Sequence, residues 1–478
     1  MEGGTLERRM QSERGMKRLL LRLLSGVAAG AAATGVMSLA MLGAQRAGLL
    51  GEPPPRRLTR IVLSPLGPLR PRGRALDAAA LVAHFGFGAG LGALFSLLPV
   101  RARSRFGGTL FGGVAWAVNY AGWLPRLGLM PPPSRDRPGR PSSMLAAHLV
   151  FGASLAVLHR KLWSAPEELQ GKVVVVCGGT RGLGRALARR LLDVGAHVAI
   201  CGRSRESLEH TRSWLQSGGG SVIAQVCDLR LEDQTRAFFE RVRRELGPID
   251  VVVANAATID VGPVEELTPD DVDAVMTEIF GSAVRATLTA LPEMQARGRG
   301  SLVFISSIGG RLGVPHLAAY SAAKFAEVGF AEALRAEVAR DGVHVLTVAP
   351  GLMRTGSHLR ARFHGDAERE LLWFGASAIM PGVSIDADRA ASLIVRAIAQ
   401  RERFLTFTLA ARLGLWLHDR FPSAWAGLAA LGGRLLPRAA NGASASSREG
   451  QELAESSSSR LVGLLASASQ PLAVKHGQ

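Results

Sequence analysis

The apolar residues of this chain follow two different patterns. In the first third they form long runs without acidic or basic side chains, over residues 23–45, 78–100, 106–125 and 141–159. After residue 171 the apolar runs are only five to seven residues long, are rich in Val and Ile, and alternate with amphipathic stretches. A chain of 478 residues usually holds more than one domain, and the change of pattern predicts two units of different class.

The long runs predict helices that cross a membrane. A helix of about 20 apolar residues spans a bilayer, and each run is close to that length. We therefore expect an all-α domain of about four transmembrane helices over residues 23–160, after a basic lead at residues 1–22. Gly26 and Gly30 are spaced so that two helices can approach closely in lipid. A soluble helical bundle is the alternative, which the glycine-rich runs disfavour because glycine is a poor helix former in water.

The polar side chains within these runs include His84, Asn119, Tyr120 and His148. They either line a polar cavity or satisfy hydrogen bonds between the helices, and we favour the second interpretation. The loops at both ends of the helices are basic, so the distribution of Lys and Arg gives no orientation across the membrane.

The short runs predict a parallel β-sheet. Six of them are nearly uncharged, as strands are when both faces of a sheet are covered: residues 172–177, 197–201, 221–227, 249–255, 300–306 and 343–349. Helical stretches such as residues 183–194 and 231–246 lie between them. Alternating strands and helices build right-handed βαβ units, so we expect an α/β domain with a doubly wound parallel sheet of Rossmann type over residues 171–408.

The turn after the first strand predicts a dinucleotide site. Gly178, Gly182 and Gly184 follow the strand with the spacing G-x-x-x-G-x-G and open a helix. Glycine permits the backbone to approach a pyrophosphate closely, and the helix N-terminus supplies N–H donors and a positive dipole end. A glycine pattern alone is weak evidence, but the strand–turn–helix context makes it strong. The cofactor-binding residues expected in this turn also include Thr180, Arg181 and Leu183.

The end of the second strand indicates which dinucleotide is bound. Sites that prefer NAD hold the ribose hydroxyls with an acidic residue there, whereas this chain has Arg203 and Ser204. Arg203, together with Arg181, can pair with the 2′-phosphate of NADP; the alternative is that both arginines are surface charges. Asp228 is expected to accept a hydrogen bond from the adenine amino group, and Asn255 to brace the sheet beside the cofactor.

Three further residues predict a catalytic site that transfers a proton as a hydride moves between cofactor and substrate. Tyr320 and Lys324 are one helical turn apart and share a face, so the hydroxyl and the ammonium can reach the same cofactor. The ammonium stabilises a phenolate, which suits Tyr320 to act as the acid/base. Ser307, at the end of a predicted strand, can hydrogen-bond a substrate carbonyl oxygen as charge develops on it. Tyr occurs at only one other position of the chain, 120.

Together these motifs resemble the short-chain dehydrogenase/reductase family. The matching pieces are the glycine turn, Asp228, the turn with Asn255, Ser307, and the pair Tyr320-x-x-x-Lys324, in family order over residues 171–400. The resemblance implies an NADP(H)-dependent oxidoreductase. It also implies that the nicotinamide half of the cofactor contacts Pro350, Gly351 and Thr355.

Two positions depart from the family's pattern. The usual Asn-Ala-Gly turn is Asn255-Ala256-Ala257, which is a mild change. Where the family commonly has a catalytic Asn that holds a water beside the lysine, this chain has Glu278. Glu278 either replaces that Asn or leaves the water to be held otherwise, so the departure concerns the proton relay and not the Ser-Tyr-Lys set.

Charge and cysteine content exclude other function classes. The formal net charge of +18 comes mostly from Arg, yet no basic stripe interleaved with aromatic residues occurs. We therefore expect no nucleic-acid partner and favour contact with anionic lipid. The three cysteines, Cys177, Cys201 and Cys227, form no C-x-x-C pair, so we expect free buried thiols in a reducing compartment and no metal site.

The last part of the chain is less regular. Residues 409–436 predict amphipathic helices that act as an interfacial membrane contact, as a lid over the substrate, or in simple packing. Residues 437–478 are rich in Ser, Ala and Gly and are expected to be disordered. The segment 352–384 predicts a flexible lid over an apolar substrate, because charges flank Leu371, Leu372, Trp373 and Phe374.

The combined prediction is a membrane-tethered, NADPH-dependent reductase of a small hydrophobic carbonyl compound, lipid-like or polycyclic. Its catalytic domain is expected in the cytoplasm, where NADPH is available, and four helices would leave both chain ends there. One alternative is an alcohol dehydrogenase or epimerase that works mainly in the oxidative direction. Another is a non-catalytic NADP(H)-sensing membrane or transport protein. The family resemblance further implies a homodimer or tetramer formed through the helices that carry Tyr320 and Glu278.

Overall fold

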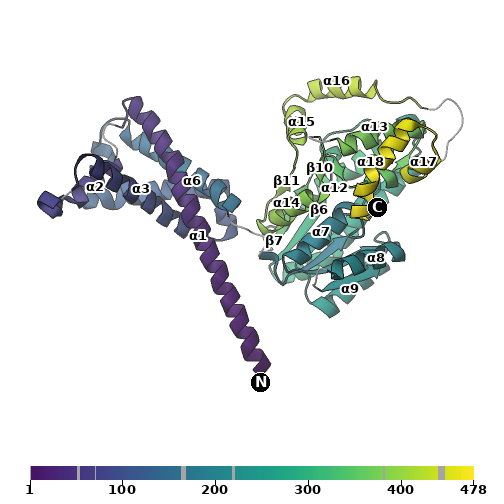
Figure 1. Cartoon of the computed structure of the whole chain (residues 1–478), viewed down its shortest axis with the longest axis horizontal. Coiled ribbons are helices and arrows are strands. Elements are labelled where there is room, and N and C mark those ends of the chain that lie inside the picture. The colour runs from purple at the N-terminus through teal and green to yellow at the C-terminus, as the bar shows by residue number, and fades with distance from the viewer. Residues whose placement is uncertain are drawn as a thin grey trace. The chain divides into compact units, whose positions relative to one another are not determined.

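The computed structural model describes residues 2–50, 54–69, 71–162, 168–217, 221–380, 383–439 and 447–477. The chain divides into two compact units, Met1–Ala165 and Pro166–Gln478. In the described residues, the first unit is built from helices alone and the second combines helices with a β-sheet (Figure 1). This arrangement confirms the prediction of an all-α region followed by an α/β domain.

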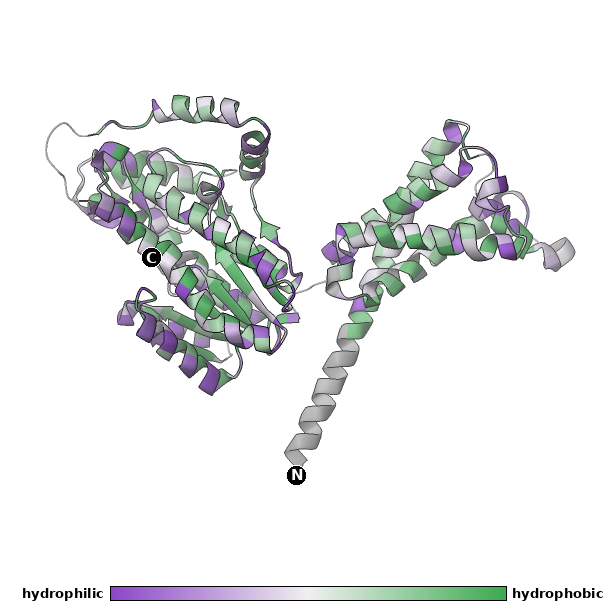
Figure 2. Ribbon diagram, turned by 180° about the vertical axis from the view of Figure 1, so that it is seen from behind, coloured by the Kyte–Doolittle hydropathy of each residue, from purple (hydrophilic) through white to green (hydrophobic). Residues whose placement is uncertain are grey.

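The helical unit contains three long helices joined by shorter ones. Large apolar side chains such as Leu39, Val82 and Phe106 are exposed on the helices of this unit, which fits contact with lipid. Many residues of these helices are hydrophobic (Figure 2). The first helix begins at Glu2, so the predicted lead over residues 1–22 is part of that helix. The elements are α1 (Glu2–Arg46), α2 (Pro54–Val62), η1 (Ser64–Leu69), α3 (Gly73–Leu97), η2 (Val100–Arg103), α4 (Arg105–Trp116), η3 (Ala117–Trp123), α5 (Leu124–Arg126), η4 (Pro133–Arg135) and α6 (Arg140–Leu162).

Three of the described helices are long and apolar enough to cross a membrane: Leu19–Arg46 within α1, α3 and α6. The fourth predicted span, residues 106–125, is not one such helix. Its α-helical pattern ends at Trp116 and continues as the π-helix η3. The Asn119 side chain donates to the Ala115 carbonyl oxygen (2.6 Å), which the backbone N–H of residue 119 would otherwise use. This competition accounts for the widened turn.

Glycines set the close packing of the helical unit. A Cβ added at Gly30 would lie 2.2 Å from the Gly88 carbonyl oxygen, and one added at Gly112 would lie 2.0 Å from the His148 carbonyl oxygen. α1 and α3, and likewise α4 and α6, therefore meet backbone to backbone, where a larger side chain would force them apart. The predicted role of Gly30 in close helix packing is confirmed.

The second unit is built on a seven-stranded sheet with the order β11-β7-β6-β4-β1-β2-β3. Every neighbouring pair in it is parallel. All six predicted strands are present, and the strand order reverses beside β1, as in a doubly wound fold. The strands are β1 (Val173–Cys177), β2 (His197–Gly202), β3 (Val222–Val226), β4 (Val251–Ala254), β6 (Gly300–Ile305), β7 (Val343–Val348) and β11 (Phe404–Leu405).

Helices cover both faces of this sheet (Figure 1). α9, α11 and α12 pack on one face in a core that includes Phe238, Met294 and Phe304. α7 and α14 pack against each other on the opposite face. Burial on both faces explains why the strands read as uncharged runs. The helices are α7 (Gly182–Asp193), α8 (Arg205–Gln216), α9 (Glu232–Leu246), α10 (Pro269–Met276), α11 (Ser282–Ala296), α12 (Ala318–Glu337), α13 (Ala367–Ile379), α14 (Ala387–Ala399), α15 (Leu409–Arg420) and α16 (Pro422–Gly433).

Shorter elements connect these helices and strands. The strand β8 (Met353–Arg354) pairs with β10 (Ile385–Asp386) in a two-stranded sheet. The π-helix η7 (Thr277–Gly281) lies between α10 and α11 and carries Glu278. The 3₁₀ turns are η6 (Val264–Glu266), η8 (Ile308–Gly310) and η9 (Ser357–Arg360).

Residues 447–477 form regular structure, so the prediction of a disordered tail over 437–478 is wrong there. β12 (Arg448–Glu449) pairs with β9 (Arg362–Phe363), which also pairs with β5 (Asp260–Val261). The helices α17 (Gly450–Ser456) and α18 (Arg460–His476) follow. They bury Leu453, Val462 and Leu465 in a core with Phe363 and Phe374. A few apolar side chains at helical spacing stabilise a helix when they pack against a partner surface. The amino-acid composition of the segment does not reveal that surface.

Candidate active site

The turn between β1 and α7 lies at the carboxyl ends of the central strands. Gly178 and Gly182 have positive φ angles of 72° and 51°, which favour glycine. A Cβ at Gly184 would lie 2.1 Å from the Gly178 carbonyl oxygen and 2.6 Å from Nδ2 of Asn255. α7 begins at Gly182, so its N-terminal N–H groups border this turn. The arrangement provides the close backbone approach that a pyrophosphate requires.

Neighbouring elements hold this turn in place. Asn255 Nδ2 donates to the Gly178 carbonyl oxygen (3.0 Å), which ties the end of β4 to the turn. Thr211 of α8 donates its hydroxyl to the Thr180 carbonyl oxygen (2.8 Å). Leu183 is buried and anchors the start of α7. Asn255 therefore braces the glycine turn itself.

Arg203 follows β2, as predicted, and is paired with Glu278. Its Nη2 donates to Oε1 (2.7 Å) and its Nη1 to Oε2 (3.2 Å), so one guanidinium engages both carboxylate oxygens. The Arg203 side chain is 54% exposed, whereas that of Glu278 is 18% exposed. Glu278 is thus engaged by Arg203 through both of its carboxylate oxygens. Next to it, the Ser204 hydroxyl caps α8 by accepting from the Ser207 N–H (3.2 Å).

Two more arginines lie near Arg203. Burial, and then the charges of Arg360 and Arg203, lower the pKa of Arg181. Arg360 also faces Glu449, with 3.6 Å between Nη1 and Oε2. Guanidinium groups gathered in this way favour a bound anion such as phosphate. Sequence reasoning missed Arg360 because only the fold brings residues 181 and 360 together.

Asp228 lies directly after β3 and is paired with Arg230. Its Oδ2 accepts from Nη2 (2.6 Å) and its Oδ1 from Nε (3.0 Å). The hydrogen bond from Arg230 lowers the pKa of Asp228. An adenine amino group would share the Asp228 carboxylate with Arg230. The hydrogen bond from adenine to Asp228 stays a prediction.

The cysteines and possible metal ligands lie apart from this chemistry. Cys177, Cys201 and Cys227 are free and buried, as predicted, and the hydrogen bond with the Cys177 thiol, together with burial, raises the pKa of Cys201. Among the described residues, one group could hold a metal ion: Asp386, Asp388 and His476. The Lys475 ammonium lies 2.6 Å from the Asp388 carboxylate and 3.7 Å from that of Asp386, so it already neutralises both. We assign no metal to this group.

Ser307, Tyr320 and Lys324 meet at the end of β6. The Ser307 Oγ accepts from the Gly309 N–H (3.1 Å) and opens η8. Tyr320 lies in the first turn of α12, and Lys324 Nζ is 5.9 Å from the centroid of its ring. A Cβ added at Gly309 would lie 3.5 Å from both the Ser307 Oγ and the Tyr320 ring. The serine hydroxyl and the phenol therefore border the same small space.

Lys324 is buried and held by Glu327. Its Nζ donates to the Ile305 carbonyl oxygen (2.8 Å) and to Glu327 Oε2 (2.9 Å), and both side chains are 1% exposed. Burial raises the pKa of Glu327 to about 7, although the charge of Lys324 opposes this. The Glu327 carboxyl beside Lys324 is therefore expected to change its charge near neutral pH. Sequence reasoning missed Glu327, although its i, i+3 spacing from Lys324 was a visible signal.

The loop after β7 joins the same edge of the sheet. Ile308 N–H donates to the Pro350 carbonyl oxygen (2.7 Å), which links this loop to the Ser307 turn. Thr355 is buried, and its hydroxyl accepts from the Ser357 N–H (3.1 Å). Gly351 faces the start of α15, where a Cβ would lie 3.3 Å from Thr408 Oγ1. Contact of this loop with a nicotinamide stays a prediction.

The predicted lid segment is a packed helix, α13. Leu371 and Phe374 are buried in the core that α17 and α18 complete. Trp373 Nε1 donates to Glu370 Oε2 (2.6 Å), and His316 Nδ1 donates to Glu370 Oε1 (2.8 Å). The helix is therefore tied to the loop before Tyr320, and its apolar residues serve the core. The segment is not the flexible lid that its sequence suggests.

The helices α15 and α16 lie beside the catalytic turn. A Cβ added at Gly414 of α15 would lie 3.8 Å from the Leu312 side chain and 3.9 Å from that of Ile308, and one added at Gly433 of α16 would lie 3.8 Å from Pro315. The two helices also leave apolar side chains exposed: Leu413, Trp416, Leu428, Leu431 and Leu435.

Known proteins are similar in sequence to the unit that contains this sheet. The sequence profile of the short chain dehydrogenase family matches residues 172–362. The chain is 34% identical over 269 residues to "Dehydrogenase/reductase SDR family protein 7-like" of Anopheles gambiae, covering 54% of this chain and 81% of that one. It is 32% identical over 195 residues to "Ketoacyl reductase HetN" of a Nostoc species, covering 41% and 68% of the two chains.

Solved structures also align with the sheet unit. A variant of actinorhodin polyketide ketoreductase with NADPH is 30% identical, with a TM-score of 0.45, and the alignment covers 50% of this chain and 95% of that chain. A short-chain dehydrogenase from Streptomyces avermitilis is 30% identical, with a TM-score of 0.47, and the coverage is 55% and 97%.

Proposed function

This chain belongs to the short-chain dehydrogenase/reductase family, and on that basis we propose that residues 171–408 reduce a small hydrophobic ketone or aldehyde with NADPH. The observation that carries the proposal is the grouping of Ser307, Tyr320 and Lys324 at the edge of the sheet that also holds the glycine turn. That edge is where open α/β sheets bind ligands.

The residues around the glycine turn fit NADP(H). A side chain at position 184 would clash with the Gly178 carbonyl oxygen, so glycine is required where the backbone approaches the pyrophosphate. Arg203, with Arg181 and Arg360 nearby, offers positive charge to the 2′-phosphate. NADPH bound there supplies the hydride. The nicotinamide half would be held by Pro350, Gly351 and Thr355.

The catalytic side chains then handle the proton. The Tyr320 hydroxyl donates its proton to the carbonyl oxygen of the substrate as negative charge develops there. The Ser307 hydroxyl donates a hydrogen bond to the same oxygen. The Lys324 ammonium stabilises the phenolate that Tyr320 becomes. In the oxidative direction the phenolate takes the proton back from an alcohol.

An apolar substrate is supported by the surface beside the catalytic turn. α15 and α16 contact Ile308 and Pro315 and expose a row of Leu and Trp side chains. The test is NADPH oxidation by the detergent-solubilised full chain over long-chain ketones, polycyclic ketones and small polar aldehydes. We expect higher kcat/KM for the hydrophobic ketones. Turnover confined to the small polar aldehydes would overturn the substrate class.

Arg203→Ala is expected to lower the preference for NADPH over NADH by about 10- to 100-fold, because it removes charged hydrogen bonds to one phosphate group. Glu278→Gln is expected to tighten NADPH binding severalfold, because the carboxylate no longer competes for Arg203. Fluorescence titration with both cofactors measures the effects. Arg205→Ala, at an exposed arginine two residues further on, is the matched control and should change neither affinity. Equal weakening of NADPH and NADH by Arg203→Ala would contradict the assignment.

Glu327→Gln is expected to move the pH of half-maximal alcohol oxidation down by about one unit. Above pH 7 the ionised Glu327 offsets the charge of Lys324, so its loss strengthens the field that stabilises the Tyr320 phenolate. The pH profile of kcat measures the shift. Glu332→Gln, on the exposed side of the same helix, is the control. A profile that is unchanged, or that moves up, would show that Glu327 has no influence on Tyr320.

Attachment to a membrane is supported by the three long apolar helices. Because NADPH is cytosolic, we place the sheet unit in the cytoplasm. Four spans would leave both chain ends in the cytoplasm, whereas three spans would put the N-terminus on the opposite side of the membrane from the sheet unit. Protease protection of tags at each end, after carbonate washing of the membranes, tests attachment and sidedness together. Release by carbonate would refute membrane insertion.

Self-association is supported by apolar side chains on the helices that flank the site. Leu288 on α11, the helix that follows η7 with Glu278, and Phe325 on α12 are 52% and 42% exposed, and burying such side chains would favour association. We propose a homodimer or tetramer through these helices. Light scattering of the detergent complex tests it, and a monomeric mass would refute it.

A further inference from the structure

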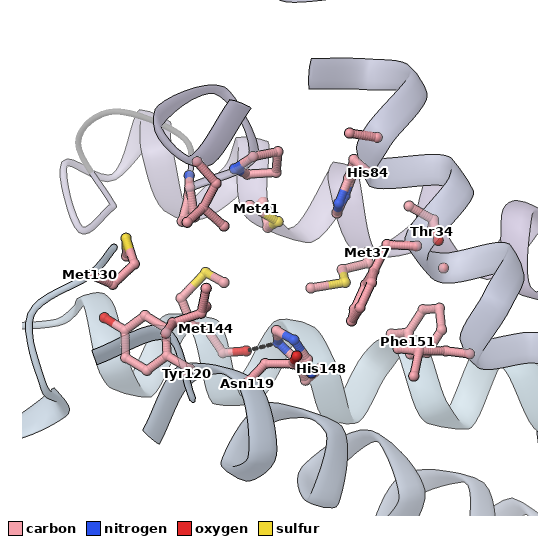
Figure 3. A pocket seen from close by; sticks show the side chains of 18 of the residues that line it. Thr34, Met37, Met41, His84, Asn119, Tyr120, Met130, Met144, His148 and Phe151 are labelled. Atoms are coloured by element: carbon pink, nitrogen blue, oxygen red, sulfur yellow. Dashed lines mark hydrogen bonds between the residues drawn. The ribbon is translucent and has the colours of Figure 1, made fainter. Parts of the chain in front are cut away.

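The helical unit contains a partly open cavity of about 230 Å³ between α1, α2, α3, η3 and α6 (Figure 3). Its walls are mostly apolar and include Met37, Met41, Met130, Met144 and Phe151. Methionine side chains adapt their shape to an occupant. An engineered apolar cavity of about 150 Å³ holds benzene, so this cavity can hold two fused rings or a chain of similar size.

Two imidazole groups from different helices line this cavity. His148 on α6 is 9% exposed, and its Nδ1 donates to the Met144 carbonyl oxygen (2.8 Å). In the neutral ring, Nε2 of His148 is therefore left as a hydrogen-bond acceptor. His84 on α3 has a buried Nε2 without a hydrogen-bond partner among the described residues. An unpaired polar atom in an apolar wall is unfavourable unless something binds it.

Three other polar side chains of the wall make hydrogen bonds within the protein. Asn119 donates to a backbone carbonyl of the preceding helical turn and accepts from Trp123 Nε1, both at 2.6 Å. The Tyr120 hydroxyl donates to the Asp136 carboxylate, and the Thr34 hydroxyl donates to a backbone carbonyl of α1 (2.8 Å). The two histidines are therefore the groups of the wall that we expect to hydrogen-bond an occupant.

The wall of the cavity includes two partly exposed aromatic residues. Phe87 and Trp123 are 49% and 41% exposed. A second cavity of about 240 Å³ shares Met41, Pro55 and His84 with the first, so His84 stands where the two adjoin. Because α3 and α6 are long and apolar enough to cross a membrane, a lipid-soluble molecule can reach Phe87 and Trp123 from the bilayer.

We propose that this cavity binds a small lipid-soluble molecule that carries a hydroxyl or carbonyl oxygen. A hydroxyl group donates to His148 Nε2, and a carbonyl oxygen accepts from His84 Nε2 when that nitrogen carries the proton. The apolar part of the molecule packs against the methionines and Phe151. The site goes beyond the proposed reductase activity and does not depend on it, because no residue of the sheet unit takes part.

The test is photolabelling of the full chain in lipid nanodiscs with a diazirine derivative of 2-tetralone, followed by peptide mapping. We expect labels on the cavity-facing residues of α3, η3 and α6. Competition by 2-tetralol should need a concentration about three- to tenfold lower than competition by tetralin, which has the same rings without oxygen. Labels spread evenly over the exposed helix faces, or equal competition by the two, would overturn the proposal.

Variants separate the site from general lipid exposure. Leu91→Trp fills the cavity and should remove the labels, whereas Leu94→Trp, on the same helix but 54% exposed, should not. Replacing His84 and His148 together by Phe should remove the advantage of 2-tetralol over tetralin. Tyr320→Phe should label like the unmodified chain, so failure of the reductase proposal would leave this test intact. Undiminished labelling of Leu91→Trp would contradict the site.

Discussion

Tyr320→Phe is expected to lower kcat by about 10²- to 10⁴-fold while leaving NADPH affinity nearly unchanged. The substitution removes the hydroxyl that delivers the proton and keeps the ring. The bonds that hold Lys324, to the Ile305 carbonyl and to Glu327, do not involve the phenol. The measurement is NADPH oxidation with a saturating ketone, beside fluorescence titration of NADPH with the same preparation.

The chain offers a matched control for this substitution. Its only other tyrosine is Tyr120, in the helical unit, where the hydroxyl donates to Asp136. Tyr120→Phe removes the same atom far from the catalytic turn in sequence and should leave kcat unchanged. If Tyr320→Phe kept more than about a tenth of the turnover, another group would have to be the acid.

Leu453→Ala is expected to destabilise the region around α13 by about 2–5 kcal/mol, the usual cost of truncating a fully buried leucine. Leu453 is 0% exposed and packs with Phe363, Phe374 and Val462. Loss of this packing should loosen α13 and so raise KM for the ketone more than it changes kcat. Hydrogen exchange of the α13 amides, with and without the substitution, measures the effect.

Leu464→Ala is the control for this prediction. Leu464 lies on α18 but is 68% exposed, so its truncation should change stability by less than about 0.5 kcal/mol. If the α13 amides stayed equally protected from hydrogen exchange in both variants, the packing of the C-terminal helices would contribute nothing to the substrate side of the site.

The sheet and most of the proposed site were predictable because their signals are local. Uncharged Val-rich runs specify buried strands, and the glycine spacing after β1 specifies a turn that only small residues permit. The pair Tyr320 and Lys324 could be placed on one face because i, i+4 spacing fixes it. In each case a few neighbouring residues determine the geometry.

The features that sequence reasoning missed depend on distant contacts. Arg360 approaches Arg181 only through the fold. The sequence left open whether Glu278 replaces the relay Asn, and it did not reveal the pairing of Glu278 with Arg203 through both carboxylate oxygens. The C-terminal helices looked disordered because their stability comes from a surface formed by α13 and β9. The π-turn at Asn119 depends on one side chain competing with a backbone bond.

The most direct test of the central claim is hydride transfer itself. NADPH carrying deuterium at the reactive C4 position is incubated with the full chain in nanodiscs and 2-tetralone, and the alcohol is analysed by mass spectrometry. We predict one deuterium on the carbinol carbon, from one face of the nicotinamide only, and at least about 10²-fold less deuterated alcohol with Tyr320→Phe in the same time. Tight NADPH binding without deuterium in any alcohol of the ketone panel would contradict a reductase and favour an NADP(H)-sensing role.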